Sequence, residues 1–445
     1  MIKNNPPWQY ELDKEFKIHK VLGDLDCDIT VVGGGIAGCS TSYALLKYTD
    51  KKVILVEAKT VASGATGHNA GYIVADFERP ITELISEFGE TLTEQAIDEI
   101  EDGWRYLCEI CDDIKFPKPE MFNSVGAYKN IREEGKEILE ENFVNNKFMI
   151  QSVYIRDNYK WLESLNENIK SNVKVLSEED FDKKLNLYGE LGKDYDGIIE
   201  EEASIMNSAK FCQEIIGYCL GQYPDRFQVL ENTKVEKIHM KSSGVTIVTD
   251  KASLKARNTV LCTNSFSGFQ IIDDKNLCIE SFSDKVYNFV GYMMGTFTQK
   301  TLPTKAGYFH HGKEKNGPIY NYFTERKFLY NSKVENLVCL GGLDIVLSEH
   351  ENYIEEEIDE ELFSDLKKFQ QEYLKINEKP EFFWKGLIGY TKTGVRIVGR
   401  DKKYSNLFYN LGCNGIGILS SISGAFRVMR IVNGEKLTPS IFDPK

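Results

Sequence analysis

Residues 27–71 read CDITVVGGGIAGCSTSYALLKYTDKKVILVEAKTVASGATGHNAG, and this stretch decides the fold of the chain. Its opening run DITVV (28–32) is rich in β-branched residues, which favours a buried parallel strand. Gly33, Gly35 and Gly38 follow with the spacing G-x-G-x-x-G. The first glycine allows a tight turn, the second lets a pyrophosphate approach the backbone, and the third lets helix and strand pack closely. The stretch therefore predicts a nucleotide-binding βαβ unit, with the diphosphate at a helix N-terminus.

The second half of this unit ends in an acidic residue. A helix is expected over residues 37–48, and KVILV (52–56) has the composition of the second strand. Glu57 closes that strand, 24 residues after Gly33. Its carboxylate can accept hydrogen bonds from both ribose hydroxyls, whereas it would repel a 2′-phosphate. The unit therefore favours NAD or FAD over NADP.

A loop of small and hydrogen-bonding residues follows, SGATGHNAG (63–71), which we call the second loop. Its backbone can pass close to a flat ring system. At this point the chain resembles the D-amino-acid oxidase superfamily of FAD-dependent amine oxidoreductases. The resemblance includes the branches of γ-glutamylputrescine oxidase and of the dimethylglycine and sarcosine dehydrogenases, extends over most of the chain, and implies FAD as the cofactor. The residues expected to contact FAD in this part of the chain are Gly33, Gly35, Ile36, Ala37, Gly38, Glu57, Ala58, Ser63, Thr66, Gly67, His68, Asn69 and Ala70.

The resemblance also implies the fold class, which is α/β. It implies a Rossmann-type FAD-binding domain with a parallel central sheet, interleaved with a substrate domain on a mostly antiparallel sheet. We expect the FAD-binding domain to comprise residues 1–120, 205–278 and 380–445, and the substrate domain residues 121–204 and 279–379. A chain of 445 residues can bury a core large enough for two such domains.

Later segments resemble the family's returns to the cofactor. The resemblance implies that Val235 meets the adenine and that Thr263 lies near the diphosphate. A glycine-rich turn then precedes the final helix. Backbone N–H groups at that helix start would face the pyrimidine oxygens of the flavin and stabilise the negative charge of the reduced ring. The residues expected there are Asn414, Gly415 and Gly417.

Residues 285–341 contain alternating runs rich in aromatic side chains, which predict antiparallel strands with one packed face. In the resembled family such a sheet covers the flavin and forms the substrate pocket. Tyr320 lies where the family often places an active-site tyrosine, and Tyr322 points the same way in a regular strand. Plain packing is the alternative for both. Arg396 is expected either to add positive charge near the flavin or to serve the structure.

Two further comparisons with the resembled family concern substrate and linkage. Positions that carry basic residues for a substrate carboxylate in glycine and sarcosine oxidases correspond to Ile388 and Leu419, which favours an amine over a small α-amino acid. His68 occupies a place similar to the histidine that is joined to the flavin in dimethylglycine and sarcosine dehydrogenases. Related oxidases often have arginine there, so covalent and non-covalent FAD are both open.

Composition excludes several classes of partner. The formal net charge is −14 without a basic tract, which argues against nucleic acid and against anionic membrane surfaces. No run of about 18 apolar residues occurs, so we expect no integral membrane segment. Ten cysteines are scattered apart from Cys108 and Cys111, which favours a reducing, cytoplasmic compartment and predicts no metal site. The expected partner is a small-molecule amine.

The function that these features predict is oxidation of the C–N bond of a small amine or amino acid. A hydride passes to flavin N5 and the imine hydrolyses, which needs positioning and desolvation more than a protein base. Dioxygen or another acceptor then takes the electrons. Two alternatives are a flavin-binding protein or subunit without independent turnover, and an NAD-dependent dehydrogenase that would share residues 28–57 but would not need the second loop.

Overall fold

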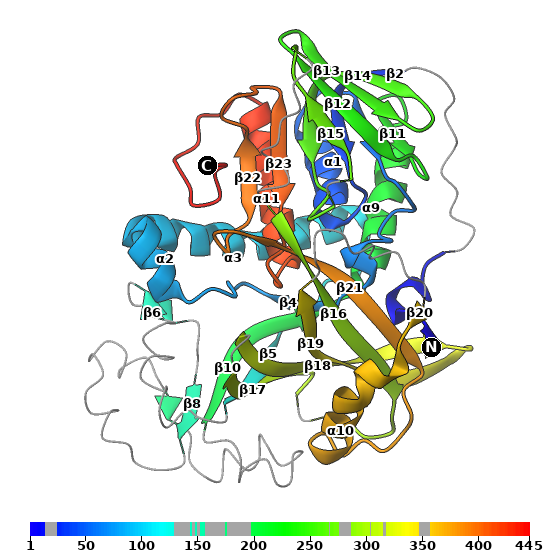
Figure 1. Ribbon diagram of the computed structural model, residues 1–445, viewed down its shortest axis with the longest axis vertical. Helices are drawn as coiled ribbons and strands as arrows, with labels where there is room; N and C mark the ends of the chain where they lie inside the picture. Colours follow the sequence, from blue (N-terminus) through cyan, green and yellow to red (C-terminus); the bar gives the residue numbers. More distant parts are fainter. Residues whose placement is uncertain are drawn as a thin grey trace.

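The computed structural model describes residues 1–13, 25–128, 143–144, 147–148, 152–155, 174–175, 197–266, 268–275, 286–302, 304–314, 317–346 and 357–445. Within these residues two large sheets are present (Figure 1). The first sheet, with helices packed on it, occupies the upper half of the view, and the second sheet occupies the lower half. The described residues thus form a mixed α/β fold with several sheets, as the sequence predicts.

The first sheet contains the βαβ unit. β2 (Leu25–Val32) pairs in parallel with β3 (Val53–Val56) and with β14 (Ser253–Leu261). The last four residues of β2 and all four of β3 are buried, as expected for parallel strands covered on both faces. The remaining strands of this sheet are β11 (Phe227–Leu230), β12 (Val235–Lys241), β13 (Gly244–Thr249), β15 (Gln270–Ile272), β22 (Ile397–Arg400) and β23 (Leu407–Leu411).

The helix of the βαβ unit lies in the centre of a helical layer. α1 (Ile36–Tyr48) is buried from Ile36 to Leu46, and it packs against α11 (Ile418–Val432) and α9 (Ser208–Gln222). Because α11 comes from the end of the chain and α9 from its middle, this layer brings distant segments together. The other helices of the described residues are α2 (Ile81–Phe88), α3 (Glu90–Ile114) and α10 (Ser364–Glu372), with short 3-10 turns η1 (Pro7–Gln9), η2 (Ala65–Gly67) and η4 (Glu360–Phe363).

The second sheet is mostly antiparallel. Its long hairpin strands are β16 (Val286–Phe297), β17 (Ala306–Glu314), β18 (Gly317–Tyr330) and β19 (Lys333–Val346). β17 also pairs in parallel with β5 (Phe122–Tyr128). The other members are β21 (Phe382–Thr391), β10 (Gly197–Ile205), β8 (Ser152–Ile155), β9 (Lys174–Val175) and β4 (Tyr72–Val74). Two small separate pairs are β1 (Ile2–Lys3) with β20 (Glu357–Ile358), and β6 (Phe143–Val144) with β7 (Lys147–Phe148).

Two strands from segments expected in the FAD-binding domain belong to the second sheet. β4 and β21 both belong to the second sheet, where they pair with β10 and β16. The expected division would place them with the FAD-binding segments 1–120 and 380–445. The five-segment division itself stays a prediction, but these two strands connect the two layers directly.

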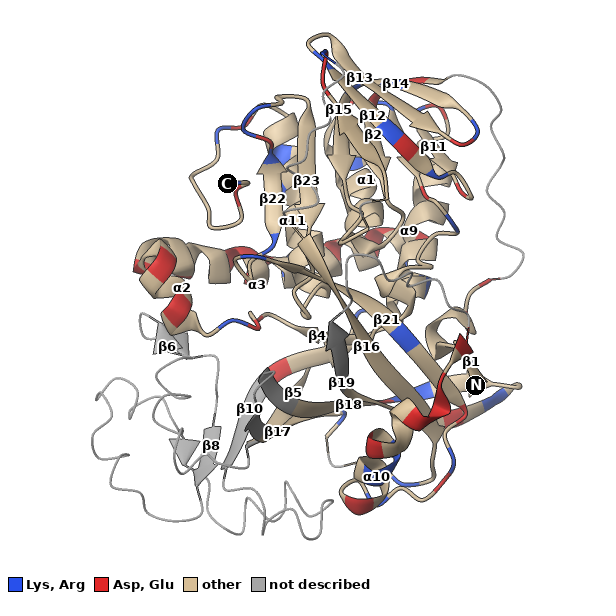
Figure 2. Cartoon of the chain, in the orientation of Figure 1, with Lys and Arg blue, Asp and Glu red and all other residues tan. Residues whose placement is uncertain are grey.

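In the described part of the chain, no helix is both long and apolar enough to span a membrane. Figure 2 shows that acidic residues occur on α2 and around α10. The α2 sequence ITELISEF contains two glutamates and no basic residue.

Candidate active site

A cavity of about 1220 Å³ lies between the two sheets. One side is formed by residues at the carboxyl ends of β2, β3 and β14, which is where open α/β sheets bind ligands. The opposite side is formed by β16, β17, β18 and β21 of the second sheet. The second loop, the start of α11 and the segment from β4 to α2 also line the cavity.

The turn between β2 and α1 has the close contacts that the glycine spacing predicts. Gly33 has φ +106°, and a Cβ there would lie 2.6 Å from the carbonyl oxygen of Cys262. A Cβ on Gly38 would lie 1.8 Å from the carbonyl oxygen of Gly33, so helix and turn can touch only without a side chain. Thr66 Oγ1 accepts a hydrogen bond from the N–H of Ile36 at 2.9 Å, which joins the second loop to the start of α1.

Glu57 lies beside this turn at the end of β3. Its Oε2 accepts a hydrogen bond from the N–H of Gly34 at 2.7 Å, and its Oε1 accepts one from the N–H of Lys59 at 2.8 Å. Burial raises the pKa of the carboxyl group, and these two N–H groups act in the opposite direction. The two backbone contacts fix the carboxylate at the cavity wall, where its remaining lone pairs can accept ribose hydroxyls.

The second loop is held by its own Asn69 and by residues distant in sequence. Ser208 Oγ, at the start of α9, donates to the carbonyl oxygen of Thr66 at 2.7 Å, and Asn69 Nδ2 donates to the same oxygen at 3.0 Å. Trp8 is fully buried, and its Nε1 donates to the carbonyl oxygen of Asn69 at 2.5 Å. The N-terminal residues therefore support the loop, although the sequence gives no sign of this contact.

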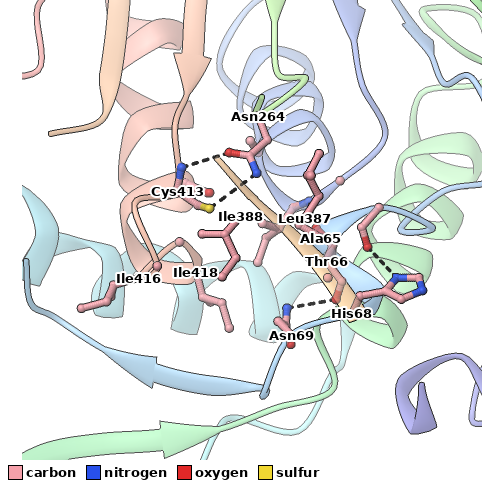
Figure 3. A pocket seen from close by; sticks show the side chains of 18 of the residues that line it. Ala65, Thr66, His68, Asn69, Asn264, Leu387, Ile388, Cys413, Ile416 and Ile418 are labelled. Carbon is pink, nitrogen blue, oxygen red and sulfur yellow. Dashed lines mark hydrogen bonds between the residues drawn. The ribbon is translucent and has the colours of Figure 1, made fainter. Parts of the chain in front are cut away.

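His68 lines the cavity close to β21 (Figure 3). Its Nδ1 is 2.9 Å from the carbonyl oxygen of Gly64, and burial lowers the pKa of the imidazole. The ring is therefore neutral at neutral pH, with Nδ1 donating to Gly64 and Nε2 left as an acceptor. A Cβ on Gly386 would lie 2.3 Å from the carbonyl oxygen of His68, so β21 and the second loop are in direct contact.

The turn before α11 forms another part of the cavity wall. Cys413 N donates to Asn264 Oδ1 at 3.0 Å, and Asn264 Nδ2 donates to Cys413 Sγ at 3.5 Å (Figure 3). Asn414 is buried with φ 44°, and its Oδ1 accepts from the N–H of Thr391 at 2.8 Å. These contacts join the turn to β21 and to the segment after β14, which orients the N-terminus of α11 toward the cavity.

Arg396 is buried behind the same turn. Its Nε donates to Asn410 Oδ1 at 2.7 Å, and its Nη2 donates to the carbonyl oxygen of Asn410 at 3.0 Å. Burial lowers the pKa of the guanidinium to about 10, so it stays charged at neutral pH. Arg396 therefore lines the cavity and also holds the backbone of the turn, whereas its role in adding positive charge near the flavin stays a prediction.

Aromatic side chains of β17 and β18 form the wall contributed by the second sheet. Tyr320 and Tyr322 both line the cavity, with ring centroids 6.0 Å apart and planes at 26°. Tyr308 and His310 line it beside them. His311 points elsewhere, and its Nε2 is 2.8 Å from Asn321 Oδ1, so adjacent histidines face opposite sides as the strand geometry requires.

Comparison with known proteins assigns the family. Residues 28–427 match the sequence model of the DAO family, described as FAD dependent oxidoreductase. The chain belongs to the DAO family of FAD-dependent oxidoreductases. This membership confirms the family and the cofactor that the sequence predicts, and it makes the protein an oxidoreductase related to amino acid and amine oxidases.

Individual DAO-family relatives match more weakly. The protein of Haemophilus influenzae named Probable oxidoreductase OrdL is 23% identical over 268 residues, which are 57% of this chain and 54% of that protein. The γ-glutamylputrescine oxidoreductase of Escherichia coli is 34% identical over 65 residues, which are 15% of each chain. The chain thus spans about half the length, or less, of these curated relatives.

Solved structures give the more extensive similarity. Glycine oxidase from Geobacillus kaustophilus aligns with a TM-score of 0.67 over 94% of this chain and 98% of that chain, at 15% sequence identity. At this identity the similarity shows the DAO fold alone.

The cavity fits the cofactor of the DAO family. The turn around Gly33 leaves backbone uncovered for a diphosphate, and Glu57 presents a carboxylate for a ribose. Thr263 Oγ1 is buried in the cavity wall without a hydrogen-bond partner among the described residues, which suits a polar ligand group. The sequence-predicted residues that line the cavity are Gly33, Gly35, Ile36, Ala37, Glu57, Ala58, Ser63, Thr66, His68, Asn69, Ala70, Val235, Thr263, Tyr320, Tyr322, Arg396, Gly415 and Gly417.

Three predicted residues do not line the cavity, and several unpredicted ones do. Gly38, Gly67 and Asn414 lie behind it, where close packing or hydrogen bonds shape the turns. Ile388 lines the cavity as expected of an apolar substitute, whereas Leu419 is buried against α3. Lining residues that the sequence did not single out include Asp76, Asn264, Tyr308 and Cys413. Asn264 and Cys413 adjoin predicted residues in sequence, and that adjacency is the one signal that could have revealed them.

Proposed function

We propose that this protein oxidises an amine at the carbon beside its nitrogen, with FAD held in the cavity described above. The observation that supports the proposal most strongly is the continuity of the cavity. The dinucleotide turn, the second loop, the start of α11 and the aromatic wall all border one space. A cofactor on one side and a substrate on the other could therefore be in direct contact.

The cofactor supplies the redox chemistry of the proposal. FAD bound in this cavity would accept the hydride that leaves the carbon beside the amine nitrogen, after which the imine hydrolyses to a carbonyl compound and dioxygen or another acceptor receives the two electrons.

The chain's own residues would position the reactants and exclude water. Tyr320 and Tyr322 offer stacked faces against which an alkylamine can pack. The N-terminus of α11 and the charged Arg396 lie on the far side, where they would stabilise negative charge that develops during the reaction. The imidazole of His68 is neutral, and its Nδ1 is hydrogen-bonded to the carbonyl oxygen of Gly64. We assign it no proton transfer.

A visible spectrum and an anaerobic amine titration test this proposal. The purified, FAD-supplemented protein should be yellow, and a panel of primary and secondary amines should bleach it in the absence of dioxygen. A yellow protein that no amine bleaches would favour a flavin-binding protein or subunit without independent turnover, and would contradict the proposal.

Acid precipitation of the same sample tests the covalent alternative at His68. Colour that stays with the pellet of the wild type, and leaves the pellet in a His68→Ala variant, would establish linkage through this residue. Colour that passes into the supernatant of the wild type would exclude the linkage without affecting the proposed reaction.

A further inference from the structure

Charged side chains are distributed unevenly along the cavity. Lys59 and Lys234 line it near Glu57, at the end expected to hold the adenosine. The end formed by the segment after β4 and by α2 is lined instead by Asp76, Glu78, Arg79 and Glu83. We call this second end the acidic compartment. Figure 2 shows acidic residues on α2, which borders it.

Asp76 is the acidic side chain of this compartment whose negative charge is balanced by the fewest protein groups. It continues the alternation of β4, so that Tyr72, Val74 and Asp76 all line the cavity. Oδ1 accepts a hydrogen bond from the N–H of Phe77 at 2.7 Å, and no basic side chain of the described residues forms an ion pair with the carboxylate. Burial raises the pKa of Asp76 to about 6, so a cation that binds beside it would stabilise the ionised form.

The two arginines that line the cavity, Arg79 and Arg396, are already engaged. Arg79 forms ion pairs with Glu83 at 3.0 Å and Glu87 at 2.6 Å, and its Nη1 donates to the carbonyl oxygen of Thr393 at 2.7 Å. The guanidinium of Arg396 donates hydrogen bonds to the side chain and carbonyl oxygen of Asn410 and to the carbonyl oxygen of Gly412. A substrate carboxylate in this space would therefore lie near the carboxylate of Asp76 and would find no free cation among the described residues there. Burying a negative charge in this way costs free energy.

The wall contributed by the second sheet favours a cation for a separate reason. Tyr308, Tyr320 and Tyr322 line the same cavity, and the rings of Tyr320 and Tyr322 are stacked with planes at 26°. The faces of tyrosine rings carry negative charge density and attract ammonium groups. An aromatic wall and an unpaired carboxylate in one cavity are complementary to an alkylammonium ion.

From these contacts we propose that Asp76 selects a substrate that carries a second, protonated amino group and no carboxylate, that is, a di- or polyamine. This rests on the proposed amine oxidation, since the reacting nitrogen is neutral and the distal nitrogen is the cation. Asp76 binds the distal ammonium, and the aromatic wall packs against the carbon chain between the two nitrogens.

Three four-carbon probes that differ at the distal end test the proposal. They are butane-1,4-diamine, butan-1-amine and 4-aminobutanoate, applied to the FAD-loaded protein without dioxygen. Stopped-flow reduction of FAD gives one dissociation constant, and the shift in unfolding temperature gives a second one that does not depend on turnover. Hydrogen bonds to charged groups imply that the wild type binds the diamine roughly 10- to 100-fold more tightly than the monoamine. 4-Aminobutanoate should bind more weakly than both.

Asp76→Asn keeps the shape of the side chain and removes its charge. We expect it to lose the preference for the diamine while it retains FAD and its affinity for the monoamine within about threefold. Glu90→Gln is the matched control, because Glu90 is an exposed acid at the first position of α3 and does not line the cavity. It should behave as the wild type does.

The outcomes separate this inference from the proposed function. Reduction of FAD by amines with an unchanged preference in Asp76→Asn would overturn the role of Asp76 and leave amine oxidation standing. A diamine-dependent rise in unfolding temperature that requires Asp76, without reduction by any probe, would support the cation site and contradict amine oxidation. If Asp76→Asn fails to fold, the wild-type ranking decides, since equal or tighter binding of 4-aminobutanoate overturns the inference by itself. The absence of any binding also overturns it.

Discussion

Replacing Gly386 by alanine tests whether β21 and the second loop together fix the shape of the cavity. Gly386 pairs with Gly291 of β16, and an added Cβ would lie 2.3 Å from the carbonyl oxygen of His68. Real Cβ atoms essentially never approach a heavy atom within 3.0 Å, so strand and loop must separate by at least 0.7 Å (3.0 − 2.3).

Neither side of this contact can move freely. The N–H of Asn5 donates to the carbonyl oxygen of Phe383 on β21 at 2.7 Å, and Trp8 holds the loop at Asn69. Overpacking of this kind costs about 1–3 kcal/mol. We expect FAD to require the loop in its wild-type position. The variant must then bring the added Cβ and the loop close together again when FAD binds, and this strain reduces the binding free energy. That strain corresponds to an FAD affinity weakened by about 5- to 150-fold.

Fluorescence quenching of FAD, titrated with apoprotein, measures this dissociation constant, and thermal unfolding measures the strain in the free protein. Gly221→Ala in α9 is the control, because an added Cβ there meets nothing within 4 Å. We expect it to keep the wild-type affinity. A Gly386→Ala variant that binds FAD and unfolds as the wild type does would refute the reasoning.

Three further predictions concern other parts of the cavity. Trp8→Phe should lower the free energy of unfolding by about 1–3 kcal/mol, because it leaves the carbonyl oxygen of Asn69 without its donor; chemical denaturation measures this, and an unchanged midpoint would contradict it. Glu57→Gln should weaken FAD binding by about 10- to 100-fold, because the charged acceptor for the ribose is lost; the same FAD titration decides, and wild-type affinity would count against the assigned role. The pKa of Asp76 is raised to about 6, so its charge is present above that pH and is lost as the pH falls through it. Diamine affinity should therefore fall between about pH 7 and 5, and a flat profile would exclude Asp76 as the cation partner.

The cofactor side of the site could be predicted because its signals are local. The turn at Gly33 and Gly38 requires particular residues at fixed spacing, and the contacts of 2.6 and 1.8 Å explain why glycine stands at both positions. The acidic end of β3 follows from the same unit. Patterns of this kind lie within about thirty residues of one another and do not depend on the rest of the fold.

The substrate side depends on contacts between distant segments, and the sequence predicts it less well. Asp76 lies in the cavity because β4 pairs with β10, more than a hundred residues later in the chain. Trp8 contacts Asn69 of the second loop 61 residues later in the chain, and Gly386 of β21 approaches His68 from much further along the sequence. Single residues of common types carry no sign of such long-range pairings.

The order in which the cavity is completed has a consequence for biosynthesis. Its lining begins with Val32 and ends with Ser421, which are separated by 389 residues (421 − 32). At about 5–20 residues per second, a ribosome needs roughly 20–80 s to supply the last of them. Until β14 (Ser253–Leu261) has been made, β2 and β3 lack this parallel partner, and until the start of α11 has been made the cavity lacks part of its wall. A chain released early would therefore contain the entire dinucleotide motif and still have no closed cavity in which to retain FAD.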